Sequence, residues 1–302
     1  MANLYTQAES NIRKTWFYLF FFLILIIAVG WAISYYFQSP VILYAAVAIS
    51  LLMNFIAYWQ SDKIVLSLNH AKPIEKRDNP ELYRVVENLC ITAGLPLPRI
   101  YIIDSAQPNA FATGRDKNHA VVAVTRGLLE KLERVELEGV LAHELSHIGN
   151  KDMLLQTVIV VLVGVIVILT DFFFRISFWG GFRGRSNKES GQIGLIMMVV
   201  AIALAILAPI FAQLIKLAIS RKREFLADAS GALLTRYPEG LARALEKISQ
   251  DPNPLRGASD ATSHLYIASP FRGKEGKAWL HKLFMTHPPL EERVKALREM
   301  KV

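Results

Sequence analysis

The chain has 302 residues, of which 53% are hydrophobic and 20% are charged, and its net charge is +8. The mean hydropathy of +0.30 is too high for an ordinary soluble domain, and the charged fraction is too high for a pure channel or transporter. A single cysteine, Cys90, excludes an internal disulfide. We therefore expect membrane helices joined to a soluble domain of about 180 residues, which is large enough for its own core.

Two apolar runs near the N-terminus predict a membrane hairpin. Residues 16–37 and 41–59 are each long enough to cross a bilayer, and a second span directly after the first argues against a cleaved signal peptide. Basic residues flank the outer ends of the hairpin: Arg13, Lys14, Lys63, Lys72, Lys76 and Arg77. The positive-inside rule then puts both flanks in the cytoplasm. Contact with anionic lipid headgroups explains this basic charge better than a nucleic-acid partner does.

The segment that follows the hairpin predicts a soluble domain with a small sheet. Alternating or short apolar runs between turn residues predict strands at 99–103, 109–113 and 120–125. Helical patterns occupy 80–93, 128–132 and 136–150.

The helix at 136–150 contains His143-Glu144-Leu145-Ser146-His147, an H-E-x-x-H pattern. Four residues are just over one helical turn, so both imidazoles project from one face. Two neutral imidazoles on one face can hold a zinc ion, and the carboxylate of Glu144 can polarise the attacking water. The pattern predicts a metal-dependent hydrolase if a third ligand exists.

A second pair of apolar runs, 154–174 and 193–219, predicts another hairpin. The connection between its two runs is basic, which runs against the charge rule if the hairpin crosses the bilayer. We expect crossing, with the first hairpin setting the topology. Residues 220–302 then return to a soluble, mostly helical pattern, with helices at 220–229, 233–250 and 291–300.

The third ligand is expected at Glu224, within Ser220-Arg-Lys-Arg-Glu-Phe-Leu-Ala-Asp-Ala229. A carboxylate there completes a His₂Glu set with one open position, which is typical of catalytic zinc. Asp228 lies one turn further on the same face. It is expected to accept the free ring N–H of one of the two histidines and to fix its tautomer. Alternatively, both carboxylates only pair with neighbouring basic side chains.

HELSHIGNKD and SRKREFLAD together resemble the HtpX-type membrane zinc endopeptidases, which are relatives of the prenyl-protein endopeptidases. Asn109-Ala-Phe-Ala112 and Thr286-His-Pro-Pro-Leu-Glu-Glu-Arg293 extend this resemblance over nearly the whole chain. The resemblance implies one zinc ion per subunit, held by His143, His147 and Glu224. It also implies that Glu144 is the catalytic carboxylate.

The resemblance further implies an edge strand at 109–112 that binds substrate backbone, although an ordinary hairpin strand is the alternative reading. The residues considered for substrate contact or for stabilising the oxyanion are Asn109, Ala110, Phe111, His264, Tyr266, His287 and Arg293.

These expectations amount to a mainly α fold with a small β-sheet (α+β), a zincin-type catalytic domain joined to four transmembrane helices. We divide the chain into a membrane hairpin (1–60), a first catalytic part (61–152), a second hairpin (153–219) and a second catalytic part (220–302). Both ligand segments lie within roughly 10 Å of the membrane face, counted at helical rise.

The predicted function is a multi-pass zinc endopeptidase of the cell (inner) membrane with a cytoplasmic active site. Its expected partners are polypeptide substrates, in particular misfolded or other membrane proteins, with membrane-protein quality control and stress response as the implied setting. A prenyl-peptide processing protease is one alternative, against which four predicted spans argue. A non-catalytic scaffold or transporter that keeps the motif is the other. The oligomeric state is left open.

Overall fold

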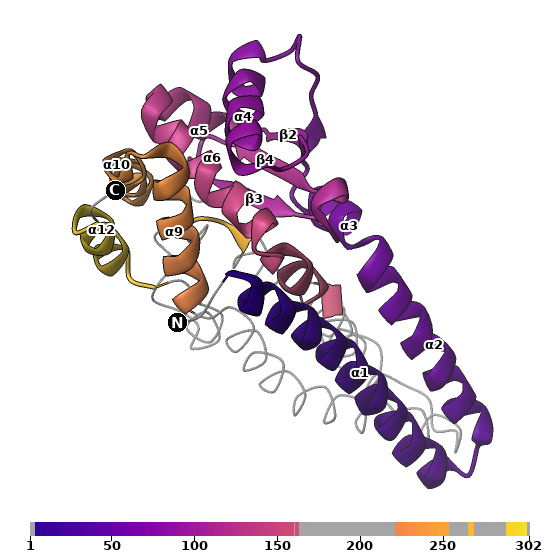
Figure 1. The fold of residues 1–302 in the computed structure, drawn as a ribbon. Helices are drawn as coiled ribbons and strands as arrows, with labels where there is room; N and C mark the ends of the chain where they lie inside the picture. The colour runs from indigo at the N-terminus through magenta and orange to yellow at the C-terminus, as the bar shows by residue number, and fades with distance from the viewer. Residues whose placement is uncertain (1–3, 160, 163–220, 254–264, 269–287, 301–302) are drawn as a thin grey trace.

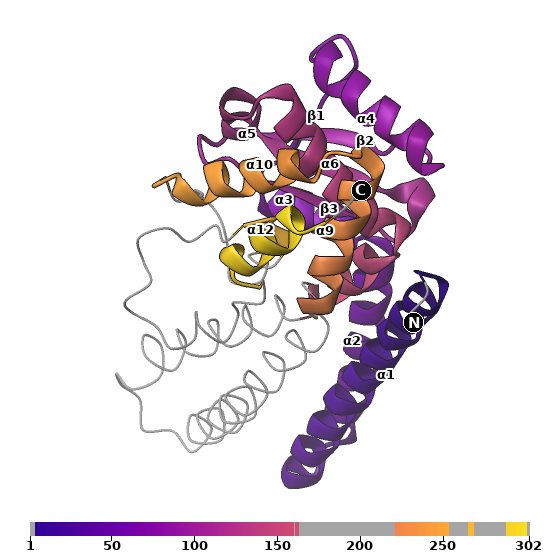
Figure 2. The ribbon, with the colours of Figure 1, turned by 60° about the vertical axis from the view of Figure 1, so that its left-hand side comes forward.

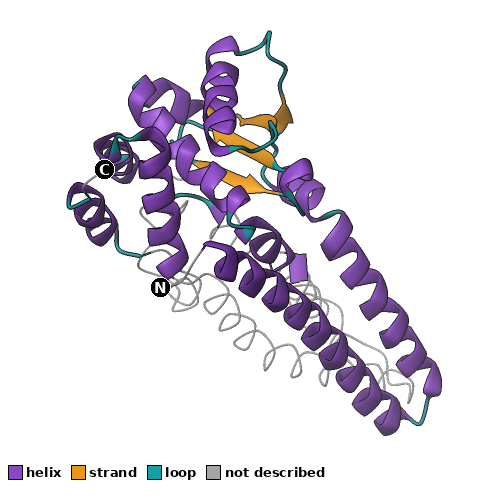
Figure 3. Cartoon of the chain, viewed as in Figure 1, coloured by secondary structure: helices purple, strands orange, loops and turns teal. Residues whose placement is uncertain are grey.

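The computed structural model describes residues 4–159, 161–162, 221–253, 265–268 and 288–300. Among these residues, two long helices extend side by side away from a domain of shorter helices and strands (Figure 1). The mainly helical fold with a small sheet is confirmed (Figure 3).

Of the second predicted membrane hairpin, residues 154–159 and 161–162 are described, and they are helical. The rest of that hairpin lies outside the described residues.

The first predicted hairpin is formed by α1 (Leu4–Phe37) and α2 (Pro40–Trp59). Both helices are long and apolar enough to cross a membrane. Large apolar side chains along them are more than half exposed, including Trp16, Phe20 and Phe55. A core helix of a soluble protein would bury such side chains, whereas a bilayer covers them. The N-terminal end of α1 continues beyond the predicted span and reaches the domain (Figure 1).

The sheet has the strand order β1-β2-β4-β3. Its strands are β1 (Lys72–Pro73), β2 (Arg99–Ile103), β3 (Ala110–Thr113) and β4 (Val121–Thr125). β2 and β4 are parallel, while the other two pairs are antiparallel. The three strands expected from the sequence are confirmed, and β3 is the outermost strand on one side of the sheet.

The remaining elements are helical: α3 (Ser61–Leu68), α4 (Pro80–Ala93), η1 (Lys117–His119), α5 (Arg126–Lys131), α6 (Arg134–Gly149), α9 (Arg221–Thr235), α10 (Pro238–Gln250) and α12 (Leu290–Arg298). α9, α10 and α12 pack together on one side of the domain (Figures 1 and 2).

α6 carries the H-E-x-x-H pattern and is the central helix of the domain. It contacts α4, α9, α10 and β3, and most of its residues are buried. Its first turn is fixed because the Glu136 side chain accepts the backbone N–H of Glu133 at 2.9 Å. Lys247 of α10 pairs with the same buried carboxylate at 2.8 Å. The motif is therefore held on a rigid, fully packed helix.

The helix predicted over 233–250 is wrong in its bounds. α9 continues through Leu233 to Thr235, and α10 starts separately at Pro238. Arg236 between them has a positive φ of 52°, a conformation that interrupts a right-handed helix. Proline then occupies the first turn of α10, where its missing N–H costs nothing.

α9 approaches α6 closely at Gly231, and this contact sets the distance between the two ligand-bearing helices. A Cβ at Gly231 would lie 2.9 Å from the backbone nitrogen of His143 and 3.1 Å from the carbonyl carbon of Ala142. Both neighbours are backbone atoms of a packed helix and cannot move aside. The glycine thus permits Glu224, two turns earlier on α9, to reach the histidines.

We expect Gly231→Ala to lower the free energy of unfolding by about 1–3 kcal/mol, because it overpacks the α6–α9 contact. Gly149→Ala is the matched control, since no heavy atom lies within 4 Å of its added Cβ. That control should leave stability unchanged or raise it by up to about 1 kcal/mol, because alanine favours helix. Denaturant unfolding of both variants measures the difference, and equal stabilities would contradict the close-approach argument.

Candidate active site

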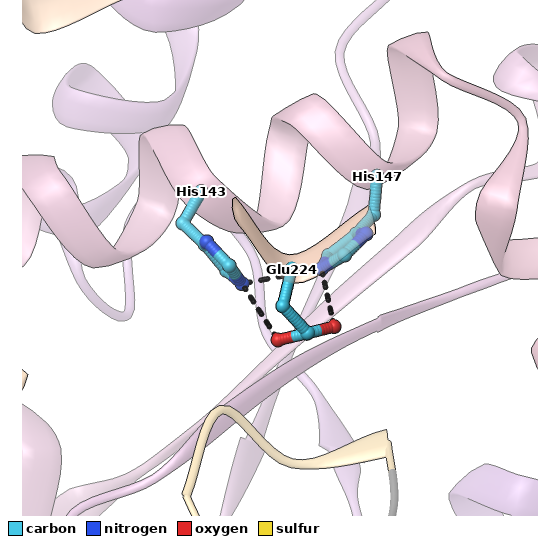
Figure 4. A group of neighbouring side chains, drawn as sticks. All are labelled: His143, His147 and Glu224. Atoms are coloured by element: carbon cyan, nitrogen blue, oxygen red, sulfur yellow. Dashed lines mark hydrogen bonds and ion pairs between the residues drawn. The ribbon is translucent and has the colours of Figure 1, made fainter. Parts of the chain in front are cut away.

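The structure brings His143, His147 and Glu224 together, as the sequence predicts (Figure 4). The two Nε2 atoms lie 3.1 Å apart. The Glu224 carboxylate oxygens lie 3.9 Å from Nε2 of His143 and 3.8 Å from Nε2 of His147. A tetrahedral zinc with bonds of about 2.0–2.1 Å needs ligand atoms roughly 3.3 Å apart. One zinc ion therefore fits among these three buried side chains with small adjustments.

The other ring nitrogen of each histidine faces a carboxylate. Nδ1 of His143 lies 2.9 Å from Asp228, as the spacing on α9 suggested. Nδ1 of His147 lies 3.2 Å from Asp152. A carboxylate on Nδ1 keeps the proton there and turns the Nε2 lone pair toward the metal position. The donor set is thus oriented for a metal ion, and Asp152 is a site residue that the sequence analysis did not single out.

Glu144 is buried beside the same three side chains and accepts a hydrogen bond from the backbone N–H of Ala112 in β3. Burial raises the pKa of Glu144, and the nearby Glu224 carboxylate adds to this, whereas His147 lowers it; the resulting pKa is about 7. Burial thus makes the Glu144 carboxyl more basic than an ordinary glutamate, which suits a proton acceptor.

The two histidines differ in their proton affinity. Burial lowers the pKa of His143 more than Asp228 raises it. Burial also lowers the pKa of His147, but the hydrogen bond to Asp152 and the charge of Glu224 outweigh it and raise this pKa to about 9. With the metal removed, His147 therefore carries a proton at neutral pH, and that proton must leave when a metal binds.

We expect zinc affinity to rise about tenfold per pH unit from pH 7 to 9, because one proton is released for each ion bound below the pKa of His147. Competition titrations of chelator-stripped protein at several pH values, corrected for protonation of the competing chelator, measure this slope. A flat affinity across this range would contradict the raised pKa.

Arg293 lies behind the ligands instead of projecting into an open cleft. Arg293 is 1% exposed, and its guanidinium donates two hydrogen bonds to Asp228, at 2.7 and 2.8 Å. A third hydrogen bond goes to the carbonyl oxygen of Ile267 at 3.1 Å. Burial raises the pKa of Asp228, but the charge and hydrogen bonds of Arg293, together with His143, outweigh it and lower the pKa of that carboxyl to about 2. Arg293 thus keeps Asp228 ionised against His143.

The predicted substrate-binding strand is partly covered by the chain itself. The register of β3 with β4 turns the backbone groups of Ala110 and Ala112 to the outer edge. The Ala110 carbonyl accepts the N–H of Ile267 at 3.1 Å, and the Asn109 side chain donates to the Ala268 carbonyl at 2.9 Å. Asn109 and Ala110 are therefore already paired within the chain, and the Ala112 end of β3 is the part left for substrate contact.

The other candidate contacts have separate positions. Phe111 packs edge-on against Tyr266, with ring centroids 5.3 Å apart. The Tyr266 hydroxyl donates its single proton to Asn69 at 2.6 Å, which leaves it no proton for an oxyanion. His264 and His287 lie outside the described residues.

Residues 76–301 match the model of peptidase family M48. The chain belongs to this family. It is a metalloprotease, which rules out the scaffold alternative raised by the sequence.

Several relatives extend the similarity beyond the peptidase region. A "Protease HtpX homolog" of Caldanaerobacter subterraneus subsp. tengcongensis is 44% identical over 301 residues, covering 99% of this chain and 98% of the relative. A "Protease HtpX homolog" of Thermococcus kodakarensis is 48% identical over 270 residues, covering 89% and 90%. The HtpX resemblance read from the motifs is thereby confirmed.

The fold is similar to the crystal structure of S. mikatae Ste24p, with a TM-score of 0.50 and 22% identity. The similarity covers 96% of this chain and 66% of that one. At this identity the similarity is one of fold alone. It covers both the helical hairpin and the domain with the small sheet.

Proposed function

We propose that this M48 metalloprotease is a zinc endopeptidase that cleaves membrane-associated polypeptides, including misfolded membrane proteins, on the cytoplasmic face of the cell membrane. The observation that carries the proposal is the buried cluster of His143, His147 and Glu224, with Glu144 beside it. Two imidazoles and one carboxylate are the donor set of a catalytic zinc site with one open position.

Zinc bound there supplies a Lewis acid, which polarises the scissile carbonyl and makes water a stronger nucleophile. Glu144 accepts the proton of the attacking water at its carboxylate and then delivers it to the leaving amine nitrogen. The N–H of Ala112 holds this carboxylate in place. Burial, which raises the pKa of this carboxyl, makes it a better proton acceptor than an ordinary glutamate.

The substrate backbone lies along the outer edge of β3 as an added strand. At Ala112 the substrate N–H bonds the carbonyl oxygen, because the Ala112 N–H is donated to Glu144. This edge lies next to Glu144, so a peptide bound along it passes the metal position. Main-chain pairing of this kind recognises an extended, unfolded segment and places few demands on its side chains. The geometry therefore favours misfolded polypeptides over folded ones.

The position of the hairpin supports a membrane-associated substrate. α1 and α2 extend from the domain that holds the site (Figure 1). The guanidinium of Arg115 lies 4.5 Å from the centroid of the Trp59 ring at the end of α2. A basic group beside an interfacial tryptophan is suited to anionic lipid headgroups. The active site is then held near the membrane surface.

Cleavage of matched substrates tests the proposal. The full chain is reconstituted in vesicles with a single-span protein that carries an unfolded juxtamembrane segment. The same segment is supplied as a soluble peptide, and a prenylated version forms a third arm. We expect the anchored segment to be cleaved at least about tenfold faster, because both molecules share one surface. Equal rates, or a preference for the prenylated peptide, would overturn the substrate assignment.

Thiol labelling tests the cytoplasmic location. Cys90 is buried and can be replaced by serine, which leaves a cysteine-free chain for single cysteines at Gln38 and Lys117. A membrane-impermeant reagent on intact cells should label Gln38→Cys in the hairpin turn, and should label Lys117→Cys only after permeabilisation. The opposite pattern would place the site outside the cytoplasm.

A further inference from the structure

We propose that Asn11, on the first membrane helix, is a positioning residue of the metal site. Asn11 holds Asp152, and Asp152 in turn holds the ring of His147. The inference rests on the proposed role of His147 as a zinc ligand. It makes the membrane hairpin a part of the active site as well as an anchor.

The first link joins α1 to the end of the motif helix. Asn11 is 1% exposed although it belongs to the hairpin helix. Its side-chain amide donates to the Asp152 carboxylate and, at 3.2 Å, to the carbonyl oxygen of Asn150. A buried amide with both donor contacts directed at one turn fixes the position of that turn.

The turn itself needs such support. α6 ends at Gly149, and the chain reverses through Lys151, whose φ is +56°. This conformation is unfavourable for a residue with a side chain and persists where surrounding contacts determine it. The reversal brings Asp152 back against the last turn of α6.

The second link runs from Asp152 to the ligand. One carboxylate oxygen of Asp152, which is 1% exposed, lies 3.2 Å from Nδ1 of His147. The other oxygen receives Asn11 and lies 3.9 Å from the guanidinium of Arg223. Arg223 directly precedes Glu224 on α9. Asp152 thus joins α1, α6 and α9 at a single buried carboxylate.

These contacts affect zinc binding because they orient the ring of His147. Without Asn11, the Asp152 carboxylate loses the donor that fixes one of its oxygens. The carboxylate then holds the ring of His147 less firmly, and zinc has to order this ring on binding. Loss of a partner that holds a metal-ligating histidine typically weakens metal affinity by about 10–100-fold.

The decisive variant is Asn11→Leu in the full chain in detergent. Leucine has a similar volume and favours helix, so α1 is retained while the amide donor is removed. We expect zinc affinity, measured by competition with a chelator, to fall by about 10–100-fold. Asn54→Leu is the matched control, because among the described residues the Asn54 amide bonds only its own helix, at the Ser50 carbonyl. The control should retain wild-type zinc affinity.

A double-mutant cycle separates positioning from a general effect on folding. Asp152→Ala should weaken zinc binding at least as much, and Asn11→Leu should cause no further loss in that background. Additive losses, or wild-type affinity in Asn11→Leu, would overturn the inference. If Asn11→Leu does not fold, Asn11→Ser takes its place with the same expected loss. A wild-type chain that binds no zinc would refute the proposed function instead.

Discussion

Replacement of Glu144 with glutamine is expected to lower peptide hydrolysis by at least about 100-fold, the usual contribution of a general base. Glutamine has nearly the same shape and still accepts the N–H of Ala112, but its amide cannot take up a proton. His143, His147 and Glu224 are unchanged, so zinc content should stay at one ion per chain. Casein cleavage and metal analysis on the same purified sample measure both quantities.

Glu138→Gln provides the matched control for that experiment. Glu138 lies on the same helix and, within the part of the chain that the structure describes, pairs only with Arg134 on the surface, at 3.1 Å. The same change of carboxylate to amide there should leave both zinc content and hydrolysis close to wild type. Full activity of Glu144→Gln with zinc bound would disprove the proposed role of Glu144.

Removal of Arg293 is expected to destabilise the protein by about 3–5 kcal/mol, because it leaves the Asp228 carboxylate buried without its charge partner. Zinc affinity should fall as well, since Asp228 no longer holds His143 in a fixed position. Arg293→Ala is compared with wild type by denaturant unfolding of the zinc-free chain. Arg293→Lys should recover only part of the loss, because an ammonium group cannot make both hydrogen bonds to Asp228.

Arg298→Ala tests whether burial of the ion pair causes the large loss of stability expected for Arg293→Ala. Arg298 belongs to the same helix, α12, and pairs with Glu239 and Glu246 at 3.0 and 2.9 Å. Because this pairing is at the surface, where ion pairs contribute little, its removal should cost far less stability than removal of Arg293. Equal losses in the free energy of unfolding for Arg293→Ala and Arg298→Ala would show that the buried pair contributes no more to stability than the exposed one.

The sequence was sufficient where a function depends on helical spacing. His143 and His147 share one face because they are four residues apart, and Glu224 and Asp228 do so for the same reason. Glycine at position 94 and proline at position 80 likewise predicted the limits of α4, which the structure confirms. Local geometry of this kind is encoded within one or two turns of chain.

Contacts across long separations were beyond the sequence. Asn11 is 141 residues from Asp152, and Arg293 is 65 residues from Asp228; no local pattern relates either pair. The division between α9 and α10 was also missed. The apolar periodicity continues past Arg236, although the helix ends at Thr235 and a new one starts at Pro238. The coverage of Asn109 and Ala110 by Ile267 and Ala268 depends on strand order, which periodicity does not determine.

The sequence by itself therefore determined the proposed chemistry of the site: two imidazoles and one carboxylate as candidate ligands, a second carboxylate as the candidate proton acceptor, and an apolar helical hairpin that precedes them. Only the tertiary structure decided what holds each ligand in place. His143 is held by Asp228 and Arg293, and His147 by Asp152 and Asn11. The physical reason is that a ligand's identity is a property of one residue, whereas its orientation depends on buried partners that only folding brings together.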